Sequence, residues 1–387
     1  MHEPAPLFSS EEYRGRVSRL QDGLKTAQMD GLLLTTPADI FYVTGFLTRF
    51  WESPARPWFV LIPATGDPVA IIPAIGAALM GQGWVKDIRT WDAPDPVDDG
   101  VSLLADAISE AIPTNGALGV PTGLETHLRM PMADYRRIVD RIKPRRIMDA
   151  TAIVQRVREI KSDAEIAKIK TTCAIADRAF ARVPEFASCG RPLEKVFRDF
   201  QIALLQEGAD WVSYVAGGAG QDGYGDVISP ATARPLAKGD ILMLDTGAVR
   251  DGYFCDFDRN YSIGAPSSAV QRVQDALYSA TDLALETLRP GMTAADLYST
   301  LTNALRSAGL TPGGGRFGHG LGITLTEWPS LTAKDTTQLR EGMVLTLEPG
   351  AEVSAGKFLV HEENIVLRAN GPELLSKRAP KDLPRIA

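Results

Sequence analysis

The apolar positions in the first part of the chain alternate between two periods. Val17, Leu20 and Leu24 recur at helical spacing behind a serine and two acidic residues, which predicts a helix over 10–26. A second helix is predicted over 99–112. Short apolar runs predict buried strands over 31–36, 58–63, 68–74 and 116–121. Because strands and helices alternate here, residues 1–153 are predicted to form an α/β domain.

The pattern changes in residues 154–387. Here the periodicity predicts an opening long helix and further helices over 193–207, 267–287 and 293–308. It also predicts a hairpin over 241–263 and two late strands over 342–350 and 358–368. Strands and long helices in separate blocks are typical of an α+β domain with an antiparallel sheet. The predicted fold class is therefore α+β, preceded by a smaller α/β domain.

The composition excludes several classes of protein. The 387 residues include 41 basic and 48 acidic side chains, a balance that predicts no nucleic-acid or anionic membrane partner. No apolar run approaches the roughly 18 residues of a membrane span, and the N-terminus has no signal-peptide pattern. Three cysteines without paired spacing suit a reducing compartment. We therefore expect a cytoplasmic protein.

The hairpin places acidic residues in strands that are otherwise apolar. Asp245 lies in the first strand, and Asp256 and Asp258 lie in the returning strand. A two-residue turn at Asp251-Gly252 places Asp245 opposite Asp258, whereas a turn one residue earlier places it opposite Asp256. Turn chemistry leaves both registers open. In either register two carboxylates meet on one face, where they repel each other unless a proton or a metal ion lies between them.

More candidate ligands follow toward the C-terminus. Glu348 ends the run "MVLTLE", and Glu363 lies in "VHEENIVL" with His361 on the same face. His319 lies between glycines in "FGHGLG", where the missing side chains let the backbone approach a neighbour closely. Carboxylates and one imidazole suit Mn, Co, Fe or Zn, and two such ions can share bridging carboxylates.

These motifs resemble the "pita-bread" family of methionine aminopeptidase, aminopeptidase P, prolidase and creatinase. Five residues occur in the order of that family's metal ligands: Asp245 in "LDTGA", Asp256 in "GYFCDFDR", His319 in "GHGLG", Glu348 in "TLEPG" and Glu363 in "EENIVL". Residues 158–180 look like the family's entry into its catalytic domain, and residues 1–153 are similar to the smaller domain of the prolidase and creatinase branch. The resemblance covers nearly the whole chain.

The resemblance implies a centre of two divalent metal ions, with Asp256 and Glu363 bridging both. Asp245 completes one ion, and His319 with Glu348 completes the other. A metal-held water of lowered pKa then attacks a carbonyl or amidine carbon next to a C–N bond. The resemblance makes Glu348 the proton shuttle, and we add His361 as a candidate assistant.

The resemblance also implies a homodimer in which the N-terminal domain leans over the partner's site. Arg49 and Trp51 follow "YVTGFLT" in a predicted loop and are candidates for substrate contact, with a packed or exposed aromatic as the alternative for Trp51. Asp258 is expected to support the ligands or to form a salt bridge, for example with Arg259, rather than to bind metal.

The neighbours of the metal ligands depart from the peptidase pattern. Three histidine positions of the peptidases hold Ile228, Gly315 and Thr326 in this chain, and Thr326 is retained as a candidate substrate contact. The family's arginine two residues before the last metal Glu is replaced by His361. The family's small hydroxyl residue two positions after the second metal Asp is replaced by Asp258. Because those histidines bind the substrate or stabilise the transition state, retained metal chemistry on another substrate is expected.

Four functions therefore stay open. The first is a metal-dependent hydrolase of a small amide or amidine, and the second is an Xaa-Pro dipeptidase that uses other residues in place of the lost histidines. The third is a metal-dependent lyase similar to a dimethylsulfoniopropionate lyase group of this fold. The last is a non-catalytic binding protein, which the complete ligand set argues against. The substrate is expected to be a small molecule or a dipeptide.

Overall fold

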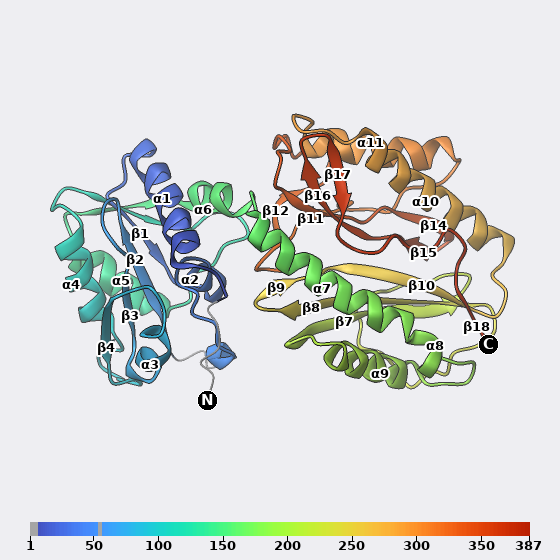
Figure 1. Ribbon diagram of the computed structural model, residues 1–387, viewed down its shortest axis with the longest axis horizontal. Coiled ribbons are helices and arrows are strands. Elements are labelled where there is room, and N and C mark those ends of the chain that lie inside the picture. Colours follow the sequence, from blue (N-terminus) through green and yellow to red (C-terminus); the bar gives the residue numbers. More distant parts are fainter. Residues whose placement is uncertain (1–6, 53–55) are drawn as a thin grey trace. The chain divides into compact units, whose positions relative to one another are not determined.

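The computed structural model describes residues 7–52 and 56–387. The chain forms two compact units, one ending at Arg158 and the other beginning at Glu159 (Figure 1). The boundary predicted after residue 153 falls inside the last helix of the first unit. Each unit has its own apolar core. No helix in the described ranges combines the length and the apolar character that crossing a membrane requires.

The N-terminal unit is built on a mixed six-stranded sheet in the order β4-β3-β2-β1-β5-β6. Its strands are β1 Gly31–Leu34, β2 Phe59–Pro63, β3 Val69–Pro73, β4 Asp87–Trp91, β5 Ala117–Val120 and β6 Arg146–Asp149. β2 pairs antiparallel with β1 and β3, and the other neighbours are parallel. The four strands predicted here correspond to β1, β2, β3 and β5.

The helices of this unit are α1 Ser10–Thr26, α2 Pro37–Thr44, α3 Ala77–Met80, α4 Val101–Ala111, α5 Met132–Arg141 and α6 Thr151–Arg158. The predicted bounds of α1 are confirmed. Its N-terminus is capped by the Ser9 hydroxyl, which accepts a hydrogen bond from the Glu12 N–H. Val17, Leu20 and Leu24 are buried, as the helical spacing predicts.

The C-terminal unit contains two five-stranded sheets and a separate hairpin. The first sheet has the order β18-β10-β8-β7 with β9 beside β8, and the second has the order β12-β11-β13-β16-β17. The strands of the first sheet are β7 Trp211–Gln221, β8 Asp240–Arg250, β9 Tyr253–Phe254, β10 Phe257–Ile263 and β18 Arg385–Ile386. Those of the second are β11 His319–Gly320, β12 Glu327–Ser330, β13 Val344–Leu347, β16 Glu363–Arg368 and β17 Gly371–Leu374. The hairpin is β14 Gly350–Ser354 with β15 Lys357–Val360.

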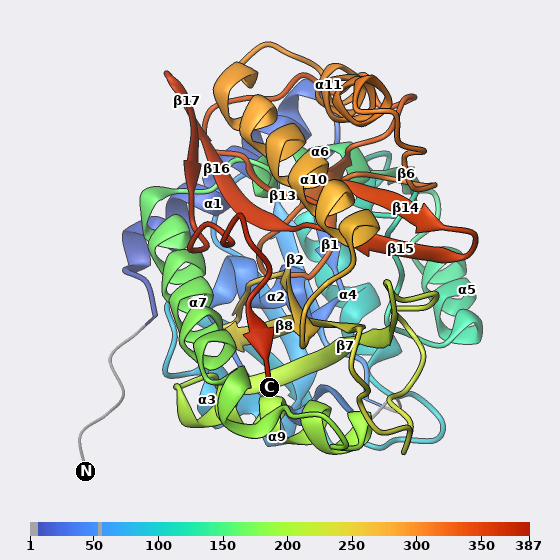
Figure 2. The same cartoon turned by 90° about the vertical axis from the view of Figure 1, so that its right-hand side faces the viewer.

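The helices of this unit divide between the two sheets. They are α7 Asp163–Ala181, α8 Val183–Phe186, α9 Leu193–Gln206, α10 Ser268–Thr287 and α11 Ala294–Ser307. Figure 1 shows α7 and α9 in green beside β7 and β8, and α10 and α11 in orange beside the second sheet. Figure 2 shows α10 in front of the strands at β14 and β15. Blocks of long helices and mainly antiparallel strands confirm the predicted α+β class.

Two features of this unit differ from the sequence prediction. The glycine-rich stretch before the hairpin forms a long strand, β7, which was not predicted. Gly217 allows this pairing, because a Cβ there would lie 2.2 Å from the Met243 carbonyl oxygen. In addition, each late strand is interrupted: β13 and β14 are separated at 348–349, and β15 and β16 at 361–362. These interruptions fall at the candidate ligands.

Candidate metal centre

The hairpin register is the one set by a turn at Asp251-Gly252. These residues have φ values of 53° and 80°, as a tight two-residue hairpin turn requires. Arg250 pairs with Tyr253. The ladder then places Asp245 opposite Asp258. Of the two registers that the sequence left open, the structure has this one.

Asp256 nevertheless reaches Asp245, because the returning strand is interrupted between β9 and β10 at residues 255–256. Two groups of potential ligand atoms share Asp256, and within each group the atoms lie within 4.8 Å of one another. The groups are Asp256 with His319 and Glu348, and Asp245 with Asp256 and Glu362. Four of the five predicted ligands therefore come together, and the fifth position is occupied by Glu362.

Glu363 lies on the opposite face of the strand from this cluster. It accepts hydrogen bonds at 3.1 Å from both Arg259 Nη2 and Arg378 Nη1, and at 2.7 Å from the Ala379 N–H. The cluster instead contains Glu362, whose buried Oε1 has no hydrogen-bond partner among the described residues. We therefore propose Glu362 in place of Glu363 as the fifth ligand.

The cause is strand register. β13 and β16 pair so that Leu347 lies opposite Glu363, and extending the ladder by one residue brings Glu348 beside Glu362. Side chains alternate along a strand, so a shift of one residue exchanges the two faces. If Glu362 is the last metal ligand, the residue two positions before it is Val360. The family's arginine is then replaced by Val360 and not by His361.

His361 also lies on the Glu363 side. Its Nε2 contacts Arg378 Nη1 and lies 3.7 Å from Glu363 Oε1, and its ring meets that of Tyr278 edge-on at 5.9 Å. Burial lowers the pKa of His361 to about 3. A neutral imidazole on this side of the strand does not support the predicted role as an assistant in proton transfer.

Asp258 belongs to neither ligand group, in agreement with its expected supporting role. Its Oδ2 accepts a hydrogen bond of 2.8 Å from Asn260 Nδ2. The expected salt bridge with Arg259 is not formed, because that guanidinium donates to the Glu363 carboxylate and to the Asp258 main-chain oxygen.

His319 is oriented so that Nε2 faces the cluster. Its Nδ1 lies 2.7 Å from the Gly320 carbonyl oxygen, and its Nε2 lies 3.1 Å from both Asp256 Oδ2 and Glu348 Oε1. An Nδ1–H that donates to a carbonyl leaves the Nε2 lone pair for a metal ion. The flanking glycines are required, because a Cβ on Gly318 would lie 2.2 Å from the Thr346 carbonyl oxygen.

The electrostatics of the cluster show an excess of negative charge. Burial raises the pKa of Asp245 and Glu362 well above the usual carboxyl range, and neighbouring carboxylates raise it further. Burial would lower the pKa of His319, but Asp256 and Glu348 raise it to about 10. Burial would raise the pKa of Glu348, but the contact with His319 lowers it. Four carboxylates around one imidazole, of which Asp256 and Glu362 are buried and Asp245 and Glu348 are partly buried, suit divalent cations.

Two residues that sequence reasoning missed hold the ligands in place. The Tyr214 hydroxyl, from β7, lies 3.2 Å from both carboxylate oxygens of Asp245 and also bonds Asp256. Asn364 Oδ1 accepts a 3.0 Å hydrogen bond from the Asp256 N–H, and Asn364 Nδ2 donates to the Asp256 carbonyl. The position of Asn364 two residues after Glu362 could have indicated it, since both side chains share a face.

Arg316 is a third missed residue, and it contacts a predicted one. Its Nη2 donates to Thr326 Oγ1 at 3.3 Å. Burial raises the pKa of Glu348, and the contact with His319 lowers it. The positive charge of Arg316 lowers this pKa further, by a smaller effect. Thr326 therefore lies beside a cation near the cluster, which is compatible with its predicted contact with substrate.

Arg49 and Trp51 lie in the N-terminal unit. The Trp51 ring packs at 5.4 Å from that of Trp58 and at 5.2 Å from the Arg129 guanidinium. Arg129 Nη2 also donates to the Trp51 carbonyl oxygen at 2.9 Å. Trp51 is thus a packed aromatic within its own unit, and Arg49 is exposed. A substrate contact by either residue stays a prediction.

An antiparallel α+β unit that gathers Asp, Glu and His side chains in this way defines a metal-dependent hydrolase of the pita-bread class. Residues 167–369 match the model of metallopeptidase family M24, and residues 16–160 match that of the creatinase/prolidase N-terminal domain. The chain belongs to metallopeptidase family M24. The resemblance found in the sequence is confirmed, and with it the assignment as an enzyme.

Relatives and solved structures match nearly the full chain. A probable dipeptidase PepE of Mycobacterium tuberculosis is 30% identical over 380 residues, which are 97% of each chain. An Xaa-Pro dipeptidase of Pyrococcus horikoshii is 24% identical over 94% of this chain and 97% of its own. The crystal structure of dipeptidase PepE from Mycobacterium ulcerans superposes with a TM-score of 0.83 at 29% identity, covering 98% of this chain and 99% of that one.

Proposed function

We propose that this enzyme hydrolyses the C–N amide bond of small dipeptides at a centre of two divalent metal ions. The observation that carries the proposal is Asp256, which belongs to both ligand groups and so supports a carboxylate shared by two ions. The dipeptidase relatives support a small peptide substrate. Nothing in the comparisons favours the lyase that the sequence left open.

The donor set fits the proposed ions. Glu362 Oε1 is buried without a hydrogen-bond partner in the described part of the chain, and no Lys or Arg is ion-paired with the cluster there. Oxygen ligands with one imidazole suit Mn, Co, Fe or Zn. Bound ions of this kind lower the pKa of a coordinated water and polarise a carbonyl group. The ligands proposed to hold them are Asp245, Asp256, His319, Glu348 and Glu362.

Glu348 is the residue placed to move a proton. Its side chain is 21% exposed, whereas the side chains of Asp256 and His319 are 6% and 2% exposed, so Glu348 lies on the accessible side of the cluster. The Thr346 hydroxyl donates to Glu348 Oε1 and fixes the direction of this carboxylate. A carboxylate held at the accessible edge can take a proton from a water molecule and deliver it to the leaving nitrogen.

Arg316 is proposed to bind the substrate carboxylate. It follows Gly315, one of the positions at which the resemblance led us to expect a histidine, and it lies beside Thr326, which holds another. A guanidinium binds a carboxylate through two parallel hydrogen bonds. The third such position, Ile228, is 87% exposed and offers no polar group. One arginine would thus replace the anchoring function of the missing histidines.

The test combines metal content with a substrate panel. Purified protein is loaded with Mn or Co, its metal is measured by elemental analysis, and hydrolysis of Gly-Pro, Ala-Pro and Ala-Ala is compared with that of N-acetylated amides. We expect about two ions per chain and cleavage of dipeptides with a free C-terminus. Two ions with cleavage of the amides alone would favour the first function left open by the sequence, a non-peptidase hydrolase. Absence of bound metal under every loading would contradict the proposal.

A further inference from the structure

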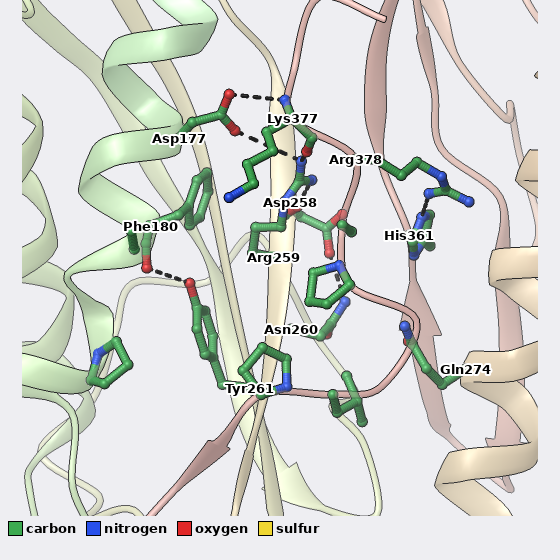
Figure 3. A pocket seen from close by; sticks show the side chains of 16 residues that line it. Asp177, Phe180, Asp258, Arg259, Asn260, Tyr261, Gln274, His361, Lys377 and Arg378 are labelled. Atoms are coloured by element: carbon green, nitrogen blue, oxygen red, sulfur yellow. Dashed lines mark hydrogen bonds and ion pairs between the residues drawn. The ribbon is translucent and has the colours of Figure 1, made fainter.

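A cavity of about 220 Å³ lies in the C-terminal unit on the Glu363 side of the strand. Its walls come from α7, β10, α10 and the segment 377–384 (Figure 3). Asp258, Gln274 and His361 line it, whereas neither ligand group of the metal centre does. The proposed peptide hydrolysis therefore makes no use of this cavity.

The pocket contains hydrogen-bond acceptors that are not satisfied. Asp258 is 1% exposed and Gln274 is 3% exposed, and within the described residues Asp258 Oδ1 and Gln274 Oε1 have no hydrogen-bond partner. Buried polar atoms of native proteins are nearly always paired, so these oxygens indicate a missing donor. Figure 3 shows both side chains at the same pocket.

The Gln274 amide has one polar atom paired and one unpaired. Its Nε2 donates to the Lys381 carbonyl oxygen at 3.5 Å, and its Oε1 is the atom left without a partner. Asn260 holds Asp258 in a similar way, because its Nδ2 donates both to Asp258 Oδ2 and to the Val360 carbonyl oxygen. The pocket thus offers a carboxylate oxygen and an amide oxygen, both of which accept hydrogen bonds.

The two arginines that line the pocket are engaged elsewhere, and Lys377 lies at its exposed edge. Arg259 is paired with Glu363 at 3.1 Å, and Arg378 with Asp282 at 2.8 Å and Glu363 at 3.1 Å. No ion pair of the Asp258 carboxylate is found in the described part of the chain. An acceptor buried without a donor is costly, and a ligand whose N–H groups reach Asp258 Oδ1 and Gln274 Oε1 removes this cost.

Apart from Asp177 and Lys377, the remaining lining is mainly apolar. It is formed by Phe180, Ala181, Pro184, Tyr261, Ala379, Pro380, Leu383 and Pro384. A volume of about 220 Å³ equals that of roughly seven waters, which is more than a single ion fills. We propose that the pocket binds a small protonated aliphatic amine, whose ammonium group donates to Asp258 and Gln274 while its carbon atoms contact the apolar wall.

Two sources can provide this ammonium group. One is a simple alkylamine, and the other is a free amino acid, whose carboxylate would meet Lys377 at the exposed edge of the same pocket. The two differ in their dependence on Lys377. An amino acid binds more weakly to Lys377→Met than to the wild type, whereas an alkylamine does not.

The test is a binding measurement on the metal-loaded enzyme. Propylammonium chloride is titrated by calorimetry at constant ionic strength, and glycine and proline are titrated in parallel. We expect one site per chain and binding that is at least tenfold weaker in Gln274→Met, which keeps the side-chain volume but removes the acceptor. Gln271→Met is the matched control, because Gln271 lies on the same helix and donates to Asp275 outside the pocket. It is expected to bind like the wild type.

Asp258→Asn is a second variant that removes the charge and keeps the shape, and its binding is also expected to be at least tenfold weaker. Binding to this variant is compared with the wild type only when both proteins hold the same amount of metal, because Asp258 is two residues from Asp256. Absence of propylammonium or amino-acid binding, unchanged binding in Gln274→Met, or a site that takes K⁺ alone would overturn the proposal. Because the assay requires no peptide turnover, its failure is distinct from a failure of the proposed hydrolysis.

Discussion

Two adjacent glutamates, Glu363 at the start of β16 and Glu362 just before it, have opposite surroundings. Glu362 faces other carboxylates, and burial together with Asp256 and Glu348 raises its pKa well above the usual range. Glu363 faces two guanidinium groups, and Arg259 together with hydrogen bonds from the Ala379 N–H and the Ser376 hydroxyl lowers its pKa even though burial opposes them. One face of the strand thus lacks a cation, and the other has its own. The comparison teaches that alternation along a strand, rather than residue type, decides whether a glutamate belongs to a metal site or to a structural ion pair.

The largest effect is expected from Glu362→Ala. Removing this ligand should lower metal content by at least one ion per chain and reduce the rate of dipeptide hydrolysis by about a thousandfold, because the bound water is no longer activated. The fold should persist, since the substitution also relieves repulsion among carboxylates. Elemental analysis and initial rates measure both effects. A variant with full metal and full rate would return Glu363 to the ligand set.

Glu363→Ala should affect stability rather than metal content. It leaves Arg259 and Arg378 without their shared carboxylate, and breaking a buried ion pair costs about 3–5 kcal/mol. The free energy of unfolding of the C-terminal unit, measured by urea denaturation, should fall by that amount while the metal-to-protein ratio is unchanged. Loss of metal with normal stability would mean that the two glutamates have exchanged roles.

A smaller effect is expected from Arg316→Gln. If Arg316 binds the substrate carboxylate, its loss should raise the KM for Gly-Pro about tenfold and leave kcat within a few-fold, because a charge-assisted hydrogen bond contributes about 1.5–3 kcal/mol. Arg306→Gln, on the exposed surface of α11, is the matched control. An equal KM for both variants would remove Arg316 from the proposed substrate site.

Much of the C-terminal unit could be predicted from its sequence, because its signals are local. The hairpin over 241–263 and the helical spacing in α10 and α11 depend on neighbouring residues in the chain, although turn chemistry left the hairpin register open. The choice between Glu362 and Glu363 does not, since it depends on how β13 pairs with β16, and each residue alone is an equally good ligand. A pairing register of this kind is not encoded by the residues of one strand.

The missed strand β7 has a different cause. Gly217, Gly218 and Gly220 lower its strand propensity, so that the pattern there indicates a loop. The close approach of Gly217 to the Met243 carbonyl depends on the neighbouring strand β8 and not on the residues of β7. Because β7 was missed, its contribution to the site, Tyr214, was missed as well. The same physical reason, tertiary pairing that overrides local propensity, accounts for both errors.

The smallest effect concerns pH and the side of the strand that carries Glu363. Burial raises the pKa of Asp177 to about 6, although the Lys377 N–H and Arg259 oppose the increase. A carboxyl group whose folded pKa lies above its unfolded value near 3.9 contributes stability below about pH 4, and this contribution is lost as the pH rises through about 6. Asp177→Asn should therefore gain about 1–2 kcal/mol relative to the wild type between pH 4 and pH 8, after allowance for the partly exposed carboxylate. Urea denaturation of the C-terminal unit at both pH values measures this gain, and a difference between the two proteins that does not change with pH would show that Asp177 has the same pKa in the folded and unfolded states.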